Sequence, residues 1–218
     1  MVILKIKQNK KKPKFALVVL DDGEKYNIYK FVVNKYGLRK GDELNPKKLQ
    51  ELLYWDEFYR AKDVALKYFD YRHRSEYEII RKLEVSKFNS NIIEKVIANL
   101  KSIGLLNDYE FAENYAKSLL NKRLISRNLM KHKLLEKKVP DEIINDVINK
   151  YYKDSDEYSI AKKVATKQLK KYQKLKPKST SREHFIRLTS FLVRRGFNRE
   201  VISKVVKEIL KIDREYEE

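Results

Sequence analysis

The chain has 218 residues, of which 50 are Lys or Arg and 31 are Asp or Glu, so its formal net charge is +19. It contains no cysteine, which excludes disulfide bonds and thiolate metal or redox sites. No apolar stretch approaches the roughly 20 residues of a membrane-spanning helix, and the N-terminus lacks a signal-peptide pattern, so we expect a cytoplasmic protein without membrane contact. The excess of positive charge predicts a polyanionic partner or an acidic protein surface.

The N-terminal part of the chain has the pattern of a small β-rich extension. Residues 15–20 and 25–29 are β-prone and flank an Asp-Asp-Gly turn, which predicts a hairpin. Residues 2–6 are expected to add a third strand. A short helix over 31–36 should end at Gly37, because glycine readily takes the left-handed conformation that follows a helix.

From Asn45 onwards the sequence is helical. Asn45 is a favourable N-cap residue, and Pro46 suits the first helical position, where its missing N–H costs nothing. Three later segments share one apolar pattern, with offsets of 51 and then 58 residues. Such a pattern predicts three tandem helical repeats. The seven matched positions are Ile79/Met130/Leu188, Leu83/Leu134/Leu192, Phe88/Val139/Phe197, Ile92/Ile143/Val201, Ile93/Ile144/Ile202, Val96/Val147/Val205 and Ile97/Ile148/Val206.

Each helical repeat is expected to contain three helices. The third helix should begin near Asn89, Pro140 or Asn198, where the two asparagines can cap it and proline is tolerated. The longer offset of the third repeat indicates an insertion around 175–179. This insertion ends at the Thr-Ser-Arg-Glu of 180–183, a capping box that restarts the helix.

The predicted fold class is mainly α: three tandem three-helix repeats form an elongated curved array, preceded by a small β-rich extension of a hairpin and a short helix. The predicted domains are the β-rich extension over 1–44, a first helical repeat with a lead-in helix over 45–108, a second repeat over 109–154, and a third repeat with a basic face and an acidic tail over 155–218.

Patterns that carry catalysis are absent from the sequence. His73, His132 and His184 occur without an H-E-x-x-H spacing and are expected to be solvated surface residues. There is no G-x-x-x-x-G-K-[ST] and no G-x-S-x-G, and five glycines do not make a phosphate cradle. We therefore expect no catalytic residue, no metal and no cofactor. A nuclease would need clustered carboxylates on facing helices, and the sequence does not indicate them.

The basic residues are more ordered than the acidic ones. Lysines recur at i, i+4, i+7 and i+11 along the first helix of the third repeat, with apolar residues on the opposite face. Between Lys162 and Arg195 there are twelve Lys or Arg residues and one acid, Glu183. A charge run is often only a solvated face, but such a face usually mixes acids with bases. Lysine dominance favours contact with a phosphate backbone or an acidic protein surface over base reading.

Tyrosine stacking on bases is a weaker interpretation, because most of the 15 tyrosines occur at core spacing. From charge and repeat position we expect partner or nucleic-acid contacts at Arg72, Arg74, Arg81, Lys122, Arg123, Arg127, Lys163, Lys167, Lys170, Lys174, Arg187, Arg194 and Arg195.

Three stretches resemble RecX regulatory proteins. They are YGLRKGDEL at 36–44, YRHRSEYEIIRKL at 71–83, and LKSIGLLND at 100–108 followed by Phe111-Ala112. The resemblance covers essentially the whole chain, including the three helical units and the β-rich extension that some members carry. The second repeat differs in having Lys138-Val139 where a glycine-containing junction is common.

The resemblance implies a modulator of the RecA recombinase. RecX-like proteins lie in the helical groove of the RecA–single-stranded DNA filament and inhibit its ATPase, strand-exchange and coprotease activities, with consequences for DNA repair and the SOS response. The implied partners are the RecA filament and single-stranded or double-stranded DNA, with the protein acting as a monomer. The alternative is a general nucleic-acid-binding helical repeat protein without a dedicated recombinase partner.

Overall fold

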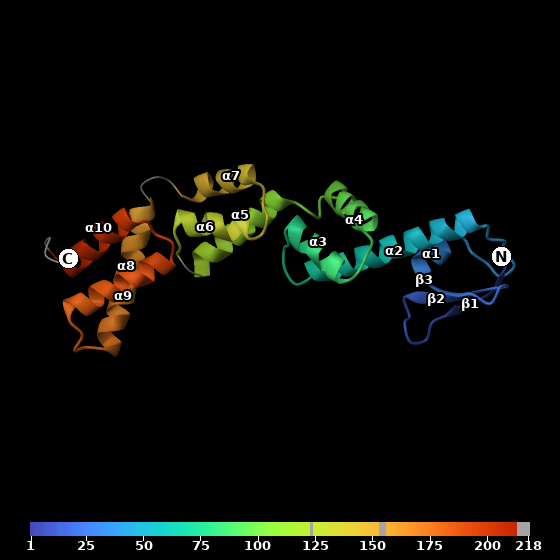
Figure 1. Ribbon diagram of the computed structural model, residues 1–218, viewed down its shortest axis with the longest axis horizontal. Helices are drawn as coiled ribbons and strands as arrows, with labels where there is room; N and C mark the ends of the chain where they lie inside the picture. The colour runs from blue at the N-terminus through green and yellow to red at the C-terminus, as the bar shows by residue number, and fades with distance from the viewer. Residues whose placement is uncertain (123, 153–155, 213–218) are drawn as a thin grey trace. The chain divides into compact units, whose positions relative to one another are not determined.

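The computed structural model describes residues 1–122, 124–152 and 156–212 (Figure 1). These residues form three β-strands followed by ten helices. The chain divides into two compact units, with the division between Leu106 and Asn107. The predicted fold class is confirmed, since the protein is mainly helical with a small antiparallel sheet at its N-terminus. The predicted domain boundaries stay predictions, and the one after residue 154 lies outside the described residues.

The N-terminal sheet consists of β1 (Ile3–Gln8), β2 (Phe15–Leu20) and β3 (Lys25–Tyr29), antiparallel and in that order. The hairpin β2–β3 has the predicted bounds. Alternate residues of β2 face the core, as period-two patterning requires: Ala16, Val18 and Leu20 are buried. Helix α1 (Lys30–Lys35) follows β3, and Gly37 lies just beyond it with a φ of 60°.

Helix α2 (Pro46–Phe69) connects the sheet with the first repeat (Figure 1). Its N-cap is the predicted Asn45, whose side chain accepts the N–H of Lys48 at 2.8 Å. In the middle of α2, the buried Asp56 accepts the N–H of Tyr29 at 2.6 Å. This bond ties the helix to the end of β3.

The first repeat is completed by α3 (Glu76–Val85) and α4 (Ser90–Ser102), which lie beside the C-terminal part of α2 (Figure 1). Ser75 and Glu78 form a complete capping box at the start of α3. The core between the three helices includes Phe58, Ala61, Ala65, Ile79, Leu83, Ile93, Val96, Ile97 and Leu100.

The second unit contains two three-helix repeats. The helices of the second repeat are α5 (Asp108–Lys122), α6 (Arg127–Leu135) and α7 (Asp141–Tyr151). The helices of the third repeat are α8 (Asp156–Leu175), α9 (Ser181–Arg194) and α10 (Arg199–Leu210). Each repeat has its own hydrophobic core, and the partly buried Ile160 packs against both.

The predicted register of the repeats agrees with burial. At five of the seven matched positions, all three side chains are buried. At the other two, Phe88, Ile143 and Val201 are half-buried. One apolar pattern therefore builds the same core three times.

The junction between the second and third helices has the same backbone geometry in each repeat. Lys87, Lys138 and Gly196 all have positive φ, at 63°, 54° and 78°. The N–H of the next residue bonds to the carbonyl five residues earlier each time, at 3.2 to 3.3 Å. These bonds make a Schellman motif, which satisfies carbonyls at the helix end. The lysine–valine junction of the second repeat therefore has the same backbone conformation as the glycine-containing junction of the third repeat.

Two local expectations were wrong. Asn198 caps α10, but the side chain of Asn89 makes no cap bond for α4 and instead donates to the carboxylate of Glu57 at 2.7 to 2.8 Å. His184 is buried, with 7% of its surface exposed, while His73 and His132 are exposed. The reason is that α9 begins about one turn before the matched helices, after the predicted cap Thr180, so that His184 lies inside its first turn.

Candidate nucleic-acid interface

Helix α8 has a buried face and a cationic face. The buried residues are Ala161, Val164, Ala165 and Leu169. The exposed lysines on the other side are Lys163, Lys167, Lys170 and Lys174. Because the helix is anchored through its small and apolar residues, the ammonium groups are free to contact a partner.

The described acids of the third repeat do not form ion pairs with this row. Lys162, on another edge of α8, donates to Glu208 of α10 at 2.7 Å, and Tyr158 donates to the same carboxylate. These hydrogen bonds lower the pKa of Glu208, so the Lys162–Glu208 pair is charged at neutral pH. In the part of the chain that the structure describes, the four lysines of the row have no ion-pair partner.

A groove of about 410 Å³ lies beside the row, between the end of α5 and helices α8 and α9. Its apolar surface comes from Leu120, Leu124, Val164 and Phe191. Its basic residues are Lys163, Lys167, Lys171 and Arg195, and its side-chain amides belong to Asn121 and Gln168. The groove thus combines cations, one aromatic ring and amides that can donate and accept hydrogen bonds.

Arg195 holds two walls of this groove together. Its Nη1 donates to the carbonyl of Leu124 at 2.7 Å, and its guanidinium lies 4.9 Å from the ring centre of Phe191. The carbonyl of Arg195 in turn accepts the N–H of Ser126 at 3.1 Å. The end of α9 is therefore bonded to the loop before α6, which fixes the groove between the second and third repeats.

This combination suits a single nucleic-acid strand. Ammonium groups contact phosphates as point charges, and a ring face can stack on a base of any identity. Non-specific single-strand binders combine these two features along a groove. Among the described residues of the groove, Arg195 is bonded to Leu124, so the side chains that could read base edges are Asn121 and Gln168.

The arginines predicted in the first repeat are engaged within the protein. Arg72 makes a bidentate pair with Glu78, at 2.6 and 2.9 Å. Arg74 donates to the carbonyl of Tyr68 at 3.1 Å and stacks on its ring at 3.8 Å. Arg81 pairs with a glutamate one turn further along α3, at 2.8 Å. Their contact with a partner stays a prediction.

The remaining predicted residues of the second unit differ in their surroundings. Arg127 donates to the side chain of Asn149 at 2.6 Å. Arg187 is half-buried, with the hydroxyl of Ser179 at 3.5 Å, and Arg194 is exposed at the end of α9. Arg123 was also predicted to contact a partner, but it lies outside the described residues. The same holds for the side chain of Lys122.

Besides the three aliphatic lining residues, sequence reasoning missed four residues of the groove that are charged, polar or aromatic: Asn121, Lys171, Gln168 and Phe191. Lys171 follows Lys167 by one turn, so a second i, i+4 series along the same helix could have found it. The other three come from three different helices. Only the packing of the repeats brings them together.

Among the described residues, no three His, Cys, Asp or Glu side chains are grouped so that they could hold a metal ion. No described helix is both long and apolar enough to span a membrane.

Comparison with known proteins gives a consistent result. Residues 61–100 match the family model of the RecX first three-helix domain, and residues 107–148 match that of the second. The Regulatory protein RecX of Clostridioides difficile is 30% identical over 212 residues, covering 97% of both chains. The Regulatory protein RecX of Clostridium acetobutylicum is 31% identical over 208 residues, covering 95% of both.

Solved structures share the fold. A crystal structure of regulatory protein RecX aligns with a TM-score of 0.68 at 23% identity, covering 94% of this chain and 98% of that one. The crystal structure of RecX from Lactobacillus salivarius aligns with a TM-score of 0.59 at 22% identity, covering 72% of this chain and 99% of that one.

Proposed function

The chain belongs to the RecX family of regulatory proteins, and from this premise we propose that it is a negative regulator of the RecA recombinase. It binds the RecA–single-stranded DNA filament and inhibits its ATPase, strand-exchange and coprotease activities, and thereby modulates DNA repair and the SOS response. It acts in the cytoplasm as a monomer, by blocking filament growth and promoting disassembly, and it catalyses no reaction itself.

The observation that carries this proposal is the lysine row of α8 beside the groove, which has no ion-pair partner among the described residues. A filament of recombinase on DNA offers both phosphates and acidic protein surface, and lysines can meet either one. The arginines of the first repeat and the lysines of α8 have different roles in this proposal. The arginines stabilise the first repeat through their internal bonds: Arg72, Arg74 and Arg81. The exposed lysines supply the positive charge that binds the partner: Lys163, Lys167, Lys170 and Lys174.

The test is a titration of the protein into a RecA ATPase assay on single-stranded DNA. The variant reverses the row, with Lys163→Glu, Lys167→Glu, Lys170→Glu and Lys174→Glu together. We expect the helix content to stay unchanged, because these side chains are exposed, and the inhibitory concentration to rise at least tenfold. In direct binding to single-stranded DNA, the negative slope of log affinity against log salt concentration should become shallower by up to roughly 3, since each lost phosphate contact removes about 0.7 from its magnitude.

The matched control reverses four exposed lysines elsewhere: Lys25, Lys47, Lys95 and Lys204. It changes the net charge by the same amount, so a general loss of positive charge would weaken both variants alike. Inhibition that survives the row reversal unchanged would make the row a solvated face and remove the basis of the proposal.

The second candidate is a general nucleic-acid-binding protein, and the groove with Phe191, Asn121 and Gln168 favours it. The two candidate functions predict different effects of salt concentration on inhibition. A filament ligand keeps inhibiting at a salt concentration that abolishes its binding to free DNA, whereas a general binder loses both together. Measuring ATPase inhibition and DNA binding at the same series of salt concentrations therefore distinguishes them.

A further inference from the structure

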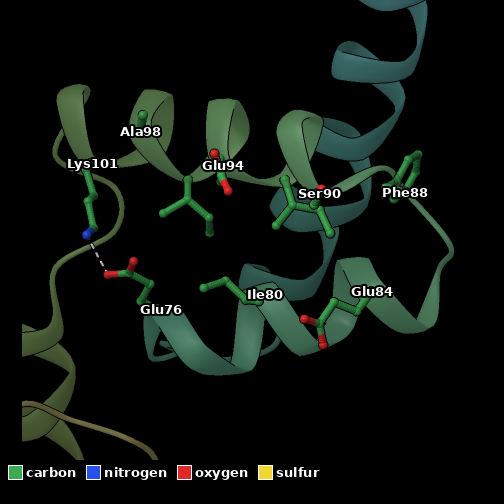
Figure 2. A pocket seen from close by; sticks show the side chains of 10 residues that line it. Glu76, Ile80, Glu84, Phe88, Ser90, Glu94, Ala98 and Lys101 are labelled. Carbon is green, nitrogen blue, oxygen red and sulfur yellow. Dashed lines mark ion pairs between the residues drawn. The ribbon is translucent and has the colours of Figure 1, made fainter.

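The first repeat carries a second surface feature, a groove of about 570 Å³ between α3 and α4 (Figure 2). Ile80 points from α3 into the space between the two helices, and Phe88 closes one end. Ile93 and Ile97 of α4 also line the groove. Its volume falls within the roughly 300–1,000 Å³ typical of ligand pockets.

The rim of this groove is acidic, although the protein is strongly cationic. Glu76, Glu84 and Glu94 line it with a single lysine, Lys101. Lys101 pairs with Glu76 at 2.6 Å at one end, as Figure 2 shows. Glu84 pairs with a neighbouring arginine of its own helix at 2.8 Å. In the part of the chain that the structure describes, Glu94 has no partner.

The fold itself does not require an apolar, acidic surface here. In the second repeat the positions matched to Glu76, Ile80, Glu94 and Ala98 are occupied by Arg127, Lys131, Asn145 and Asn149. Arg127 donates to Asn149 at 2.6 Å, so polar side chains bond across the same face of the homologous helix pair. Both repeats nevertheless bury their side chains at five of the seven matched apolar positions. The groove of the first repeat is therefore a local specialisation.

We propose that this groove docks a cationic amphipathic helix of a protein partner. The apolar side chains of such a helix, spaced at i, i+4 and i+7, fit against the half-buried Ile80 and Phe88, with the buried Ile93 and Ile97 forming the apolar base of the groove. The flanking Lys or Arg residues of the helix meet the glutamates of the rim. Charge complementarity favours this occupant, because three glutamates and one lysine line the rim and Glu94 has no ion-pair partner among the described residues. The site is independent of the lysine row on α8, which takes a polyanion.

The probe is a fluorescein-labelled designed peptide of about 15 residues, long enough for several helical turns. It carries leucines at i, i+4 and i+7, and lysines elsewhere. A second peptide has the same leucines with glutamates in place of the lysines, and a third is scrambled. We expect anisotropy to show saturable binding of the first peptide, with at least tenfold weaker binding of the other two.

The variant Ile80→Lys, Glu94→Asn places the residues of the second repeat into the groove. Because the second repeat folds with these residues, the helix content should stay unchanged, while the affinity for the peptide should fall at least tenfold. The matched control is Val85→Lys, since Val85 is 70% exposed on the same helix and does not line the groove. It should bind like the unaltered protein.

A local readout comes from Ala98→Cys, since the chain has no other cysteine and Ala98 is an exposed residue of the groove. An environment-sensitive dye on this thiol should shift to shorter wavelength when the peptide binds. Equal affinity for the three peptides, or full affinity after the double substitution, would overturn the proposal. So would a dimer in sedimentation that Ile80→Lys abolishes, because the groove would then hold a second copy. The assay uses neither recombinase nor DNA, so these outcomes leave the proposed function untouched.

Discussion

At the scale of single residues, the left-handed position that ends each second helix has different requirements in the three repeats. Lys87 and Lys138 occupy it with exposed side chains, whereas the third repeat has Gly196. A Cβ built on Gly196 would lie 2.7 Å from the Cβ of Leu129 and 2.7 Å from Oγ of Ser126. The glycine is therefore needed less for its φ than for the close approach of α9 to the start of α6.

Gly196→Ala should lower the free energy of unfolding by about 2–4 kcal/mol, from left-handed strain and from the overpacking together. The matched control is Lys138→Gly, which removes strain at the equivalent open position and should raise stability by up to about 1 kcal/mol. Urea unfolding of both variants measures the difference. A tolerated alanine at position 196 would show that the two repeats separate easily at this contact.

Asp56 is a buried acid whose environment gives the protein a pH dependence. The residue is 4% exposed, and its carboxylate accepts the N–H of Tyr29 and, at 3.2 Å, an N–H of Arg60. Burial raises the pKa of Asp56, and the hydrogen bonds from Tyr29 and Arg60 offset only part of this effect. The folded state therefore favours the protonated acid, a contribution that is present below an unfolded pKa of about 3.9 and lost as pH rises through the folded pKa.

Asp56→Asn keeps an oxygen acceptor for the N–H of Tyr29 but carries no charge. Its stability relative to the unaltered protein should therefore increase between about pH 4 and pH 7. Urea unfolding of both proteins at the two pH values isolates the contribution of this residue. Asp56→Ala, which leaves the N–H without an acceptor, should instead cost about 1–3 kcal/mol at either pH. A stability difference that falls with rising pH would contradict the assignment.

At the scale of elements, most of the fold could be predicted because local rules and tertiary packing agree. The β2–β3 hairpin, the cap of α2 at Asn45 and the repeated apolar register all follow from patterns within a few turns of chain. The failures occur where another element competes. Asn89 was expected to cap α4, but Glu57 of α2 accepts its amide hydrogens instead. Such a contact depends on packing that no single helix encodes.

The same distinction applies to the two binding surfaces. The lysine row of α8 lies on one helix, so periodicity alone predicts which side chains share a face. The neighbouring groove combines Asn121 of α5, Gln168 of α8 and Phe191 of α9, and its shape depends on how the second and third repeats pack. The groove of the first repeat lies between consecutive helices. Comparing Ile80 with its matched Lys131 could have indicated it.

At the scale of the whole molecule, the cores are arranged by unit. The first unit contains one core around the sheet and a second one between α2, α3 and α4. Trp55 and Tyr59 pack against both of these cores. The cores of the second and third repeats share Ile160 in the same way. We therefore expect cooperative unfolding within each unit and separate responses of the two units to a core substitution.

Leu134→Asp tests this division, because Leu134 is fully buried in the core of the second repeat. A buried carboxylate without a partner should cost more than about 4 kcal/mol, enough to unfold the second repeat and, through Ile160, to loosen the third. Residues 1–106 should keep their protection in hydrogen-exchange mass spectrometry, since both of their cores lie within the first unit. The adjacent Leu135→Asp is the control, because Leu135 is 37% exposed and its substitution should leave the exchange pattern intact. A circular-dichroism melt unchanged by Leu134→Asp would mean that the repeat register is wrong, and loss of protection throughout the chain would mean that the two units fold as one.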